Sequence, residues 1–142
     1  MIMKPKLFSI AAACLLLAGA SCGDGFPQAA KDFVKQYYPD LAMTSCETDD
    51  DGDCDIHVKG DVEIELDAQG EWKTVKDPGG VPAGIVPDAI MTYVKENYMG
   101  RTIVGIDREP QGYEVELFGD IEMKFDRQGN FLELEYDKIV IN

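Results

Sequence analysis

The chain has 142 residues, with 27 acidic side chains against 13 basic ones and a formal net charge of −14. A charge this negative disfavours nucleic acid and anionic lipid surfaces as partners, because both would repel the protein. It is compatible with a strongly solvated surface, with cation binding or with a basic protein partner. The length suffices for one compact domain or for two very small halves that share a sheet.

Residues 1–21 have the pattern of an export signal. Two lysines precede an apolar stretch from Leu7 to Gly19, and small residues follow it. An apolar stretch of this length is too short to remain as a membrane-spanning helix. The sequence therefore predicts an exported protein of the periplasm or outer membrane.

The end of this signal fits two kinds of processing. Ala18-Gly19-Ala20 fits ordinary cleavage, whereas Gly19-Ala20-Ser21-Cys22 resembles a lipobox, with Gly19 where a strict lipobox has Leu. We favour a lipid anchor on Cys22, followed by a tether over residues 22–25. The alternative is that Cys22 merely lies near an ordinary cleavage site.

Two stretches of the chain share one sequence pattern. Residues 60–72, which read GDVEIELDAQGEW, recur as GDIEMKFDRQGNF in residues 119–131, about 60 residues further along the chain. The repetition predicts a duplicated supersecondary unit, with a first repeat over residues 26–76, a linker over residues 77–85 and a second repeat over residues 86–142.

Each repeat is expected to begin with an amphipathic helix. Residues 27–38 carry apolar side chains at helical spacing, and residues 87–98 repeat that spacing. A proline, Pro27 or Pro87, stands at the first turn, where its missing N–H removes no hydrogen bond. We expect the aromatic side chains of both helices to lie in the core.

Short segments of alternating apolar and polar residues follow each helix, which is typical of antiparallel strands covered on one face. Val58 and Val62 must share a face, so the turn between them needs an odd number of residues or a bulge. Residues 67–70 and 126–129 predict type I turns that end in a left-handed glycine. The predicted fold is α+β: a tandem repeat of one helix plus about four antiparallel strands, with the helices packed on one face of the sheet.

Cys46 and Cys54 flank a turn-forming acidic segment, residues 47–53. Export places these cysteines in an oxidising compartment, so a disulfide across the hairpin is predicted. In the chain-entropy model such a bond would stabilise by about 2–3 kcal/mol. The spacing is not the Cys-x-x-Cys of a catalytic thiol pair.

The patterns Pro-x-Ala-x3-Phe-Val-x3-Tyr-Pro from Pro27 and GYEVELFGDIEMKFDRQGNF from Gly112 resemble the PepSY-like family of exported bacterial proteins, which is also described as beta-lactamase-inhibitor-like. The resemblance covers nearly all of the chain after the export signal. It implies tandem α/β units like those of the beta-lactamase inhibitory protein, in a Gram-negative envelope. It implies no catalytic motif, and the label describes fold similarity rather than inhibition.

The residues needed for catalysis are scarce. His57 is the sole histidine, and Ser45 is the sole serine after Cys22, so a Ser-His or Cys-His nucleophile pair is hard to assemble. His57 alternates outward on its strand, which favours a solvated side chain over a general base. The sequence therefore predicts no catalytic residues, no enzyme activity and no required cofactor.

The acidic loop has partial EF-hand spacing. If Glu47 is position 1 of such a loop, the ligand positions 3, 5 and 7 are Asp49, Asp51 and Asp53, and the glycine position 6 is Gly52. The glutamate expected at position 12 is replaced by Val58. A hairpin turn explains the same residues. Weak Ca²⁺ binding at Asp49, Asp51 and Asp53 is therefore the alternative function rather than the favoured one.

Binding through the uncovered sheet face is the favoured function. We expect a non-enzymatic envelope module that binds a protein or peptide with a basic surface, with inhibition or regulation of that partner as a further role. Apart from a lipid on Cys22, no membrane contact is expected. Trp72 and Phe131 occupy equivalent positions and are predicted to close the core. The predicted contact residues are Glu63, Glu65, Glu114, Glu116, Phe118 and Glu122.

Overall fold

The computed structural model describes residues 25–136. The predicted export signal, the lipidation site Cys22, all but the last residue of the tether and the end of the second repeat therefore lie outside the described residues. Within them, no helix is long and apolar enough to cross a membrane. The chain forms two compact units, and the boundary between them falls between Trp72 and Lys73.

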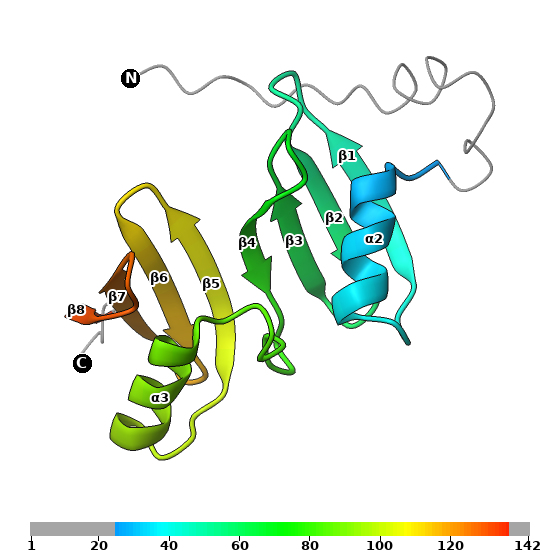
Figure 1. Ribbon diagram of the computed structural model, residues 1–142. Coiled ribbons are helices and arrows are strands. Elements are labelled where there is room, and N and C mark those ends of the chain that lie inside the picture. Colours follow the sequence, from blue (N-terminus) through cyan, green and yellow to red (C-terminus); the bar gives the residue numbers. More distant parts are fainter. Residues whose placement is uncertain (1–24, 137–142) are drawn as a thin grey trace, which may run out of the picture. The chain divides into compact units, whose positions relative to one another are not determined.

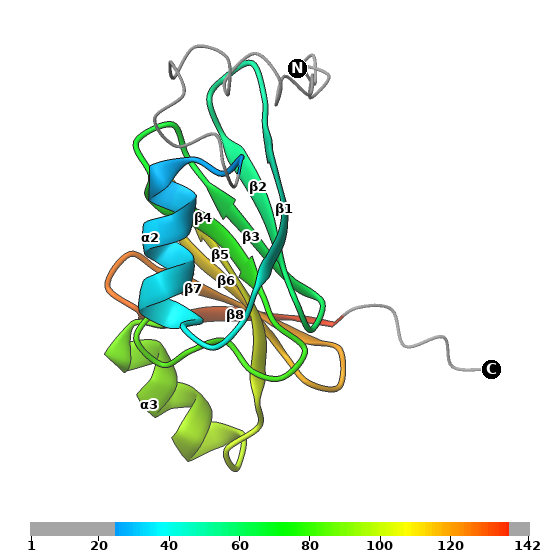
Figure 2. The ribbon, with the colours of Figure 1, turned by 90° about the vertical axis from the view of Figure 1, so that its right-hand side faces the viewer.

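The first unit consists of one helix and a meander of strands (Figure 1). The strands lie in chain order with antiparallel neighbours, β1 beside β2 and β2 beside β3. Helix α2 runs along one face of these strands in both views (Figure 2). The elements are α2 (Gln28–Tyr37), β1 (Met43–Thr48), β2 (Cys54–Val58) and β3 (Val62–Leu66), and β4 (Trp72–Lys76) begins at the unit boundary.

The second unit repeats this order of elements and adds β4 as a neighbour of its first strand. Its strands are ordered β4-β5-β6-β7-β8, and every neighbouring pair is antiparallel. Helix α3 lies on the apolar side of the sheet, where its Tyr93 packs edge-on against Phe125. The elements are α3 (Asp88–Asn97), β5 (Ile103–Glu109), β6 (Gly112–Leu117), β7 (Ile121–Asp126) and β8 (Phe131–Tyr136). The α+β class predicted from the sequence is confirmed.

Both helices begin directly after a proline. Pro27 and Pro87 have φ of −58° and −55°, close to the value that the proline ring imposes. Each helix ends with a lysine in its last turn, Lys35 or Lys95, where a positive charge faces the partly negative carbonyl end of the helix. The predicted helices are confirmed, with ends one residue inside the predicted ranges.

The turn chemistry is the same in the two units. Val58 pairs with Val62, and Leu117 pairs with Ile121, so each turn holds three residues and keeps both apolar sets on one face, as parity requires. Their last residues, Asp61 and Asp120, have φ of 62° and 61°. The predicted odd loop is therefore confirmed in both units.

The second predicted turn type also occurs twice. Gly70 and Gly129 have φ of 84° and 83°, and their N–H groups donate to the carbonyls of Asp67 and Asp126 over 2.9 and 3.0 Å. The carboxylate of each aspartate accepts backbone N–H groups further along its turn. These side-chain hydrogen bonds hold the turn in the conformation that the next strand needs.

The core consists of the inward residues of the strands and the inner face of each helix. Ile56, Val115, Leu117 and Met123 are fully or almost fully buried. Trp72 is buried, as predicted. Phe131 is half-buried and stacks on Tyr93 with ring centroids 4.7 Å apart, so it closes the second unit's aromatic cluster.

Cys46 and Cys54 are buried and free in the structure, so the predicted disulfide is not confirmed. The register explains their arrangement: Cys46 lies opposite Ile56, and Cys54 lies opposite Thr48. The cysteines are thus diagonal neighbours on the apolar face, where the Cα atoms are further apart than in a directly opposite pair. A hydrogen bond between the two thiols, followed by burial, raises the pKa of the Cys46 thiol.

Candidate functional site

The polar side of the second unit's sheet carries many charged side chains. The strand register places alternate residues of β5, β6, β7 and β8 on this side, opposite α3. Most of these side chains are half-buried by one another. We call this surface the second unit's acidic face; it comprises Asp107, Glu109, Glu114, Glu116, Glu122, Lys124, Glu133 and Glu135.

Three carboxylates of this face converge. Oxygen atoms of Glu114, Glu122 and Glu135 all lie within 4.8 Å of one another. Partial burial and then the neighbouring charges of Glu135, Glu109, Glu122 and Asp107 raise the pKa of Glu114. The carboxylates therefore repel one another, and a cation bound here would relieve that repulsion.

Lys124 lies beside this carboxylate cluster. Its Nζ is 2.7 Å from Glu135 Oε1 and 3.6 Å from Glu133 Oε1. The hydrogen bond to Glu135, together with that charge, raises the pKa of Lys124. One lysine offsets only part of the charge of seven acidic side chains on the face, so the face remains negative.

The polar side of the first unit is also acidic but carries fewer charges. Glu63 and Glu65 lie on β3 opposite His57 and Asp55. His57 is exposed, and its Nδ1 is 4.0 Å from Glu63 Oε1, which is a weak contact at an exposed site. The prediction that His57 is a solvated strand residue is confirmed.

The predicted contact residues are thus divided between the two units. Glu114, Glu116 and Glu122 share the second unit's acidic face, whereas Glu63 and Glu65 lie on the first unit. Phe118 is 68% exposed at the tip of the β6–β7 turn. Each residue has the outward orientation that the alternation predicts.

The predicted cation loop forms the β1–β2 hairpin. Asp49 Oδ1 accepts the N–H groups of Asp51 and Asp53 at 2.9 and 3.0 Å, and Asp49 N donates to Asp53 O. The Asp49 carboxylate is therefore engaged by the turn itself. This agrees with the hairpin interpretation of the sequence, and cation binding at this loop stays a prediction.

Sequence analysis missed Glu135 as a member of the carboxylate cluster. A bulge between Lys124 and Phe125 shifts the β7–β8 register, so alternation alone could not align β8 with the other strands. Glu133 and Glu135 do alternate with Leu132 and Leu134, and that pattern was the available signal.

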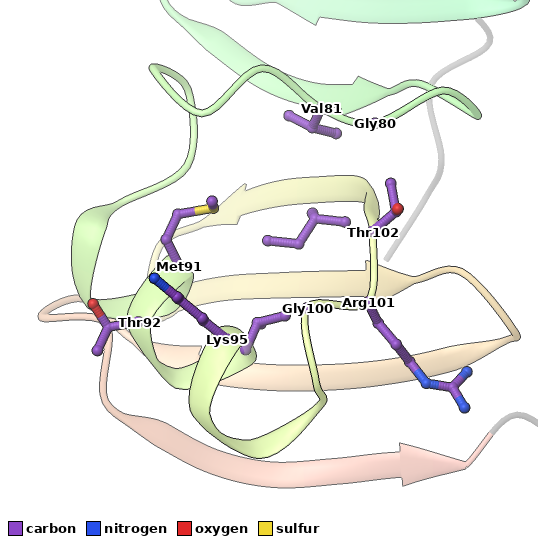
Figure 3. Close-up of a pocket in the computed structure, with 10 residues that line it drawn as sticks. Gly80, Val81, Met91, Thr92, Lys95, Gly100, Arg101 and Thr102 are labelled. Atoms are coloured by element: carbon purple, nitrogen blue, oxygen red, sulfur yellow. The ribbon is translucent and has the colours of Figure 1, made fainter.

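A pocket of about 510 Å³ lies within the second unit, between α3, the loop before it and the start of β5. Figure 3 shows Val81 across the pocket from Met91, with Lys95 on the helix side and the Arg101 side chain directed outward at the far end. The lining is mainly apolar. No sequence motif pointed to this pocket, because its residues come from three separate segments.

The comparisons with known proteins place this chain in a family. The model of the family described as "Putative beta-lactamase-inhibitor-like, PepSY-like" matches residues 53–133, more than half of the chain. The chain belongs to the PepSY-like family. The resemblance noted in the sequence is confirmed.

Three solved structures resemble this PepSY-like protein over most of its length. A "putative periplasmic protein of unknown function" from Bacteroides vulgatus is 29% identical, with 79% of this chain and 93% of that chain covered and a TM-score of 0.73. A "putative calcium-regulated periplasmic protein" from Bacteroides thetaiotaomicron is 30% identical, with 78% and 90% covered and a TM-score of 0.72. A third periplasmic protein, from Bacteroides vulgatus, is 31% identical, with 79% and 91% covered and a TM-score of 0.70.

These relatives support export of the PepSY-like protein to the periplasm. Neither the family description nor the relatives' descriptions name an enzyme activity. No curated protein is similar enough to this chain to be matched.

Proposed function

We propose that this PepSY-like protein is a non-enzymatic periplasmic module that binds a basic protein or peptide through the second unit's acidic face. The observation that carries the proposal is the crowding of carboxylates on four adjacent strands, which adds to the effect of partial burial in raising the pKa of Glu114. Lysine or arginine side chains of a partner would replace carboxylate repulsion with attraction, and they would set orientation and specificity. By covering the basic surface of the partner, this binding would inhibit or regulate the partner.

The proposal is tested by affinity capture from a periplasmic extract at low and high salt. The diagnostic variant carries Glu114→Lys and Glu116→Lys, and the matched control carries Glu63→Lys and Glu65→Lys on the first unit. We expect one prey that is lost at high salt and lost with the second-unit variant alone. A prey that both variants retain, or the absence of any prey, would refute binding by this face.

A second candidate function is calcium binding, which the description of one relative as calcium-regulated favours. The oxygen ligands that Ca²⁺ prefers converge at Glu114, Glu122 and Glu135, so we propose these three rather than the β1–β2 loop as the ligands. Lys124 would have to leave Glu135 when the ion binds, which predicts weak affinity.

Thermal unfolding in the presence of Ca²⁺ tests this candidate. We expect a rise in melting temperature that saturates with Ca²⁺ and is lost in Glu122→Gln. Asp51→Asn, in the loop with EF-hand spacing, should leave the rise unchanged. A rise lost in Asp51→Asn but kept in Glu122→Gln would return the site to the loop, and no rise at about 10 mM Ca²⁺ would exclude both sites as calcium sites of ordinary affinity.

We further propose that Cys46 and Cys54 form a disulfide after export. Their thiols are already in hydrogen-bond contact, and an oxidant of the envelope would take up the two electrons and two protons that the new S–S bond releases. Mass spectrometry of protein from the periplasm should show no alkylation at either cysteine without prior reduction. Full alkylation of both cysteines in protein that was denatured without reductant would contradict the bond.

We also propose that the periplasmic module carries a lipid anchor on Cys22. A mature chain that begins at Cys22 with covalently bound acyl chains would be held at the membrane, with the two units in the periplasm. Cys22→Ser should then release the protein into the soluble fraction. A soluble wild-type protein with an ordinary cleaved terminus would contradict lipidation.

The repeated order of one helix and four strands supports a tandem duplication as the origin of the two units. Sequences of further family members would test this, because both repeats should align with one ancestral pattern.

A further inference from the structure

The pocket beside α3 has a chemistry unlike the rest of the described surface. Among its ten lining residues, Lys95 and Arg101 are positively charged and none is negatively charged, although acidic residues outnumber basic ones two to one in the chain. The other eight are apolar or small, and the larger apolar side chains among them are Val81, Met91, Val94 and Ile103.

The walls of this pocket are fixed by backbone hydrogen bonds. The loop before α3 is attached to β5 by Asp77 N to Val104 O at 2.9 Å and by Val81 N to Ile103 O at 2.8 Å. The other wall is α3 itself, whose Val94 is buried against the sheet. The volume of this pocket, about 510 Å³, lies within the range of small-molecule sites.

Arg101 is held at one end of the pocket. Its Nη1 donates to the carbonyl of Phe118 at 3.1 Å, which leaves further guanidinium N–H groups for an anion. A second hollow of about 510 Å³ shares Gly100, Arg101 and Thr102 with the pocket. It adds Met99 and Phe118, whose side chains are 94% and 68% exposed, so apolar surface continues on the far side of the arginine.

The corresponding positions of the first unit lack this combination. In the aligned helices, Met91 and Thr92 correspond to Lys31 and Asp32, and Arg101 corresponds to Leu41. Asp32 accepts a hydrogen bond from Gln28 over 2.8 Å, so that helix presents an acid where α3 presents a threonine. Lys95 and Val94 have counterparts of the same type, Lys35 and Val34.

We infer that this pocket binds an amphipathic organic anion, a molecule with a linear or aromatic apolar body and one acidic head group. The apolar body would fill the pocket between Val81, Met91 and Ile103, and the head group would lie beside the Lys95 ammonium on the helix side, because the Arg101 guanidinium is directed outward at the far end (Figure 3). Burial of each methylene group would stabilise the complex by about 0.8 kcal/mol. This site is independent of the acidic face, so either proposal can fail without the other.

The negative charge of the whole protein opposes this ligand at long range. Screening limits that repulsion at physiological salt to charges within about 8 Å, and the pocket lining itself contains no acidic residue. The chain therefore selects against anions without an apolar body and accepts those whose burial outweighs the long-range repulsion.

The test is a competition experiment with three ligands of one chain length. The fluorescent anion 8-anilinonaphthalene-1-sulfonate serves as the probe, and decanoate, 1-decanol and decyltrimethylammonium compete with it below their micelle concentrations. We expect decanoate to displace the probe about 10-fold better than decanol and the ammonium ligand not to displace it. Equal displacement by all three would reduce the site to non-specific apolar adsorption and overturn the inference.

Two variants and a matched control separate the pocket from general charge effects. Lys95→Glu should weaken the binding of decanoate by about 10-fold or more. Lys35→Glu, the same change at the same helix position of the first unit, should leave that binding unchanged. Met91→Trp should fill the pocket and remove binding while the circular dichroism and melting temperature show a folded protein. Equal losses in Lys95→Glu and Lys35→Glu would overturn the inference, as would binding to phosphatidylglycerol vesicles without binding to decanoate.

Discussion

The two units have the same order of helix, strands and turns, and they differ in the side chains that these elements carry. Each begins with a helix that follows a proline, and each has a three-residue turn and an aspartate-glycine turn in corresponding places. The register irregularity near the start of β1, between Met43 and Ser45, recurs in β5 between Ile103 and Gly105. Backbone-determining residues are therefore retained in both units.

The side chains built on this plan are different. The first unit places the thiols of Cys46 and Cys54 on its apolar face. The second unit has Ile106 and Tyr113 at the corresponding positions and gathers Tyr93, Phe125 and Phe131 into an aromatic cluster. The turns and bulges, which set the strand register, are therefore the same in both units, because a shift in register would move every side chain to the other face. The core side chains differ, because a core of suitable volume can be packed with different apolar residues.

The largest expected difference between the units concerns their equivalent core positions. Ile106→Ala should lower the free energy of unfolding by about 3 kcal/mol, because Ile106 is 1% exposed and its loss leaves a cavity. Cys46→Ala, which removes one sulfur atom from a site that is 5% exposed, should cost about 1 kcal/mol. Urea denaturation of the reduced proteins measures both, and equal costs would show that the two cores are equally packed.

The turn glycines provide the next comparison. Gly129→Ala and Gly70→Ala each introduce a Cβ at positive φ, which costs about 1–2 kcal/mol. The new Cβ would lie 2.8 Å from Ala89 Cβ in the second unit and 3.2 Å from Ala29 Cβ in the first. We expect Gly129→Ala to destabilise more in the same denaturation assay. A larger effect of Gly70→Ala would mean that the helix approaches its turn more closely in the first unit.

The turn carboxylate of the second unit should give a pH-dependent effect. Hydrogen bonds from Asn130 and Gln128, of which the Asn130 N–H contributes most, lower the pKa of Asp126. A lowered native pKa adds stability above the unfolded pKa, and that stability is lost as the pH falls through the native pKa. Asp126→Asn should therefore be less stable than wild type at pH 7 and equally stable at low pH. A difference that persists unchanged in acid would contradict this account.

The acidic face should show the smallest effect, with the opposite sign. Because the pKa of Glu114 is raised, its carboxylate destabilises the native state above the native pKa, and this destabilisation disappears as the pH falls below the unfolded pKa. Glu114→Gln should raise the melting temperature at pH 7 by about 2–4 °C, since exposed charge interactions are worth less than about 1 kcal/mol. Glu63→Gln on the first unit is the control and should change it less.

Much of the fold could be predicted from local residues. Proline placement gave the helix starts, and alternation gave the strands. The parity of Val58 with Val62 required the three-residue turn that is observed. The β7–β8 register could not be predicted in this way, because the adjacent apolar residues Phe131 and Leu132 break the alternation of β8 without showing where the bulge aligns with β7.

The candidate sites were less predictable than the fold. The outward glutamates followed from alternation, but their meeting with Glu135 depended on that same bulge. The pocket beside α3 brings together the loop at Val81, the helix at Lys95 and the strand at Ile103. Periodic patterns in the sequence could not show that these three segments come together, because the contacts between them form across separate parts of the chain.

The sequence by itself thus determined the α+β class, the helices and turns, and the acidic character of the outward strand residues. Each of these follows from interactions among residues close in the chain, or from the simple rule that alternate strand residues share a face. The tertiary structure alone decided that the two cysteines are diagonal rather than opposite, that three glutamates from three strands converge, and that two cations border an apolar pocket. Those features depend on register and on packing between distant segments, where a shift of one residue would change every contact.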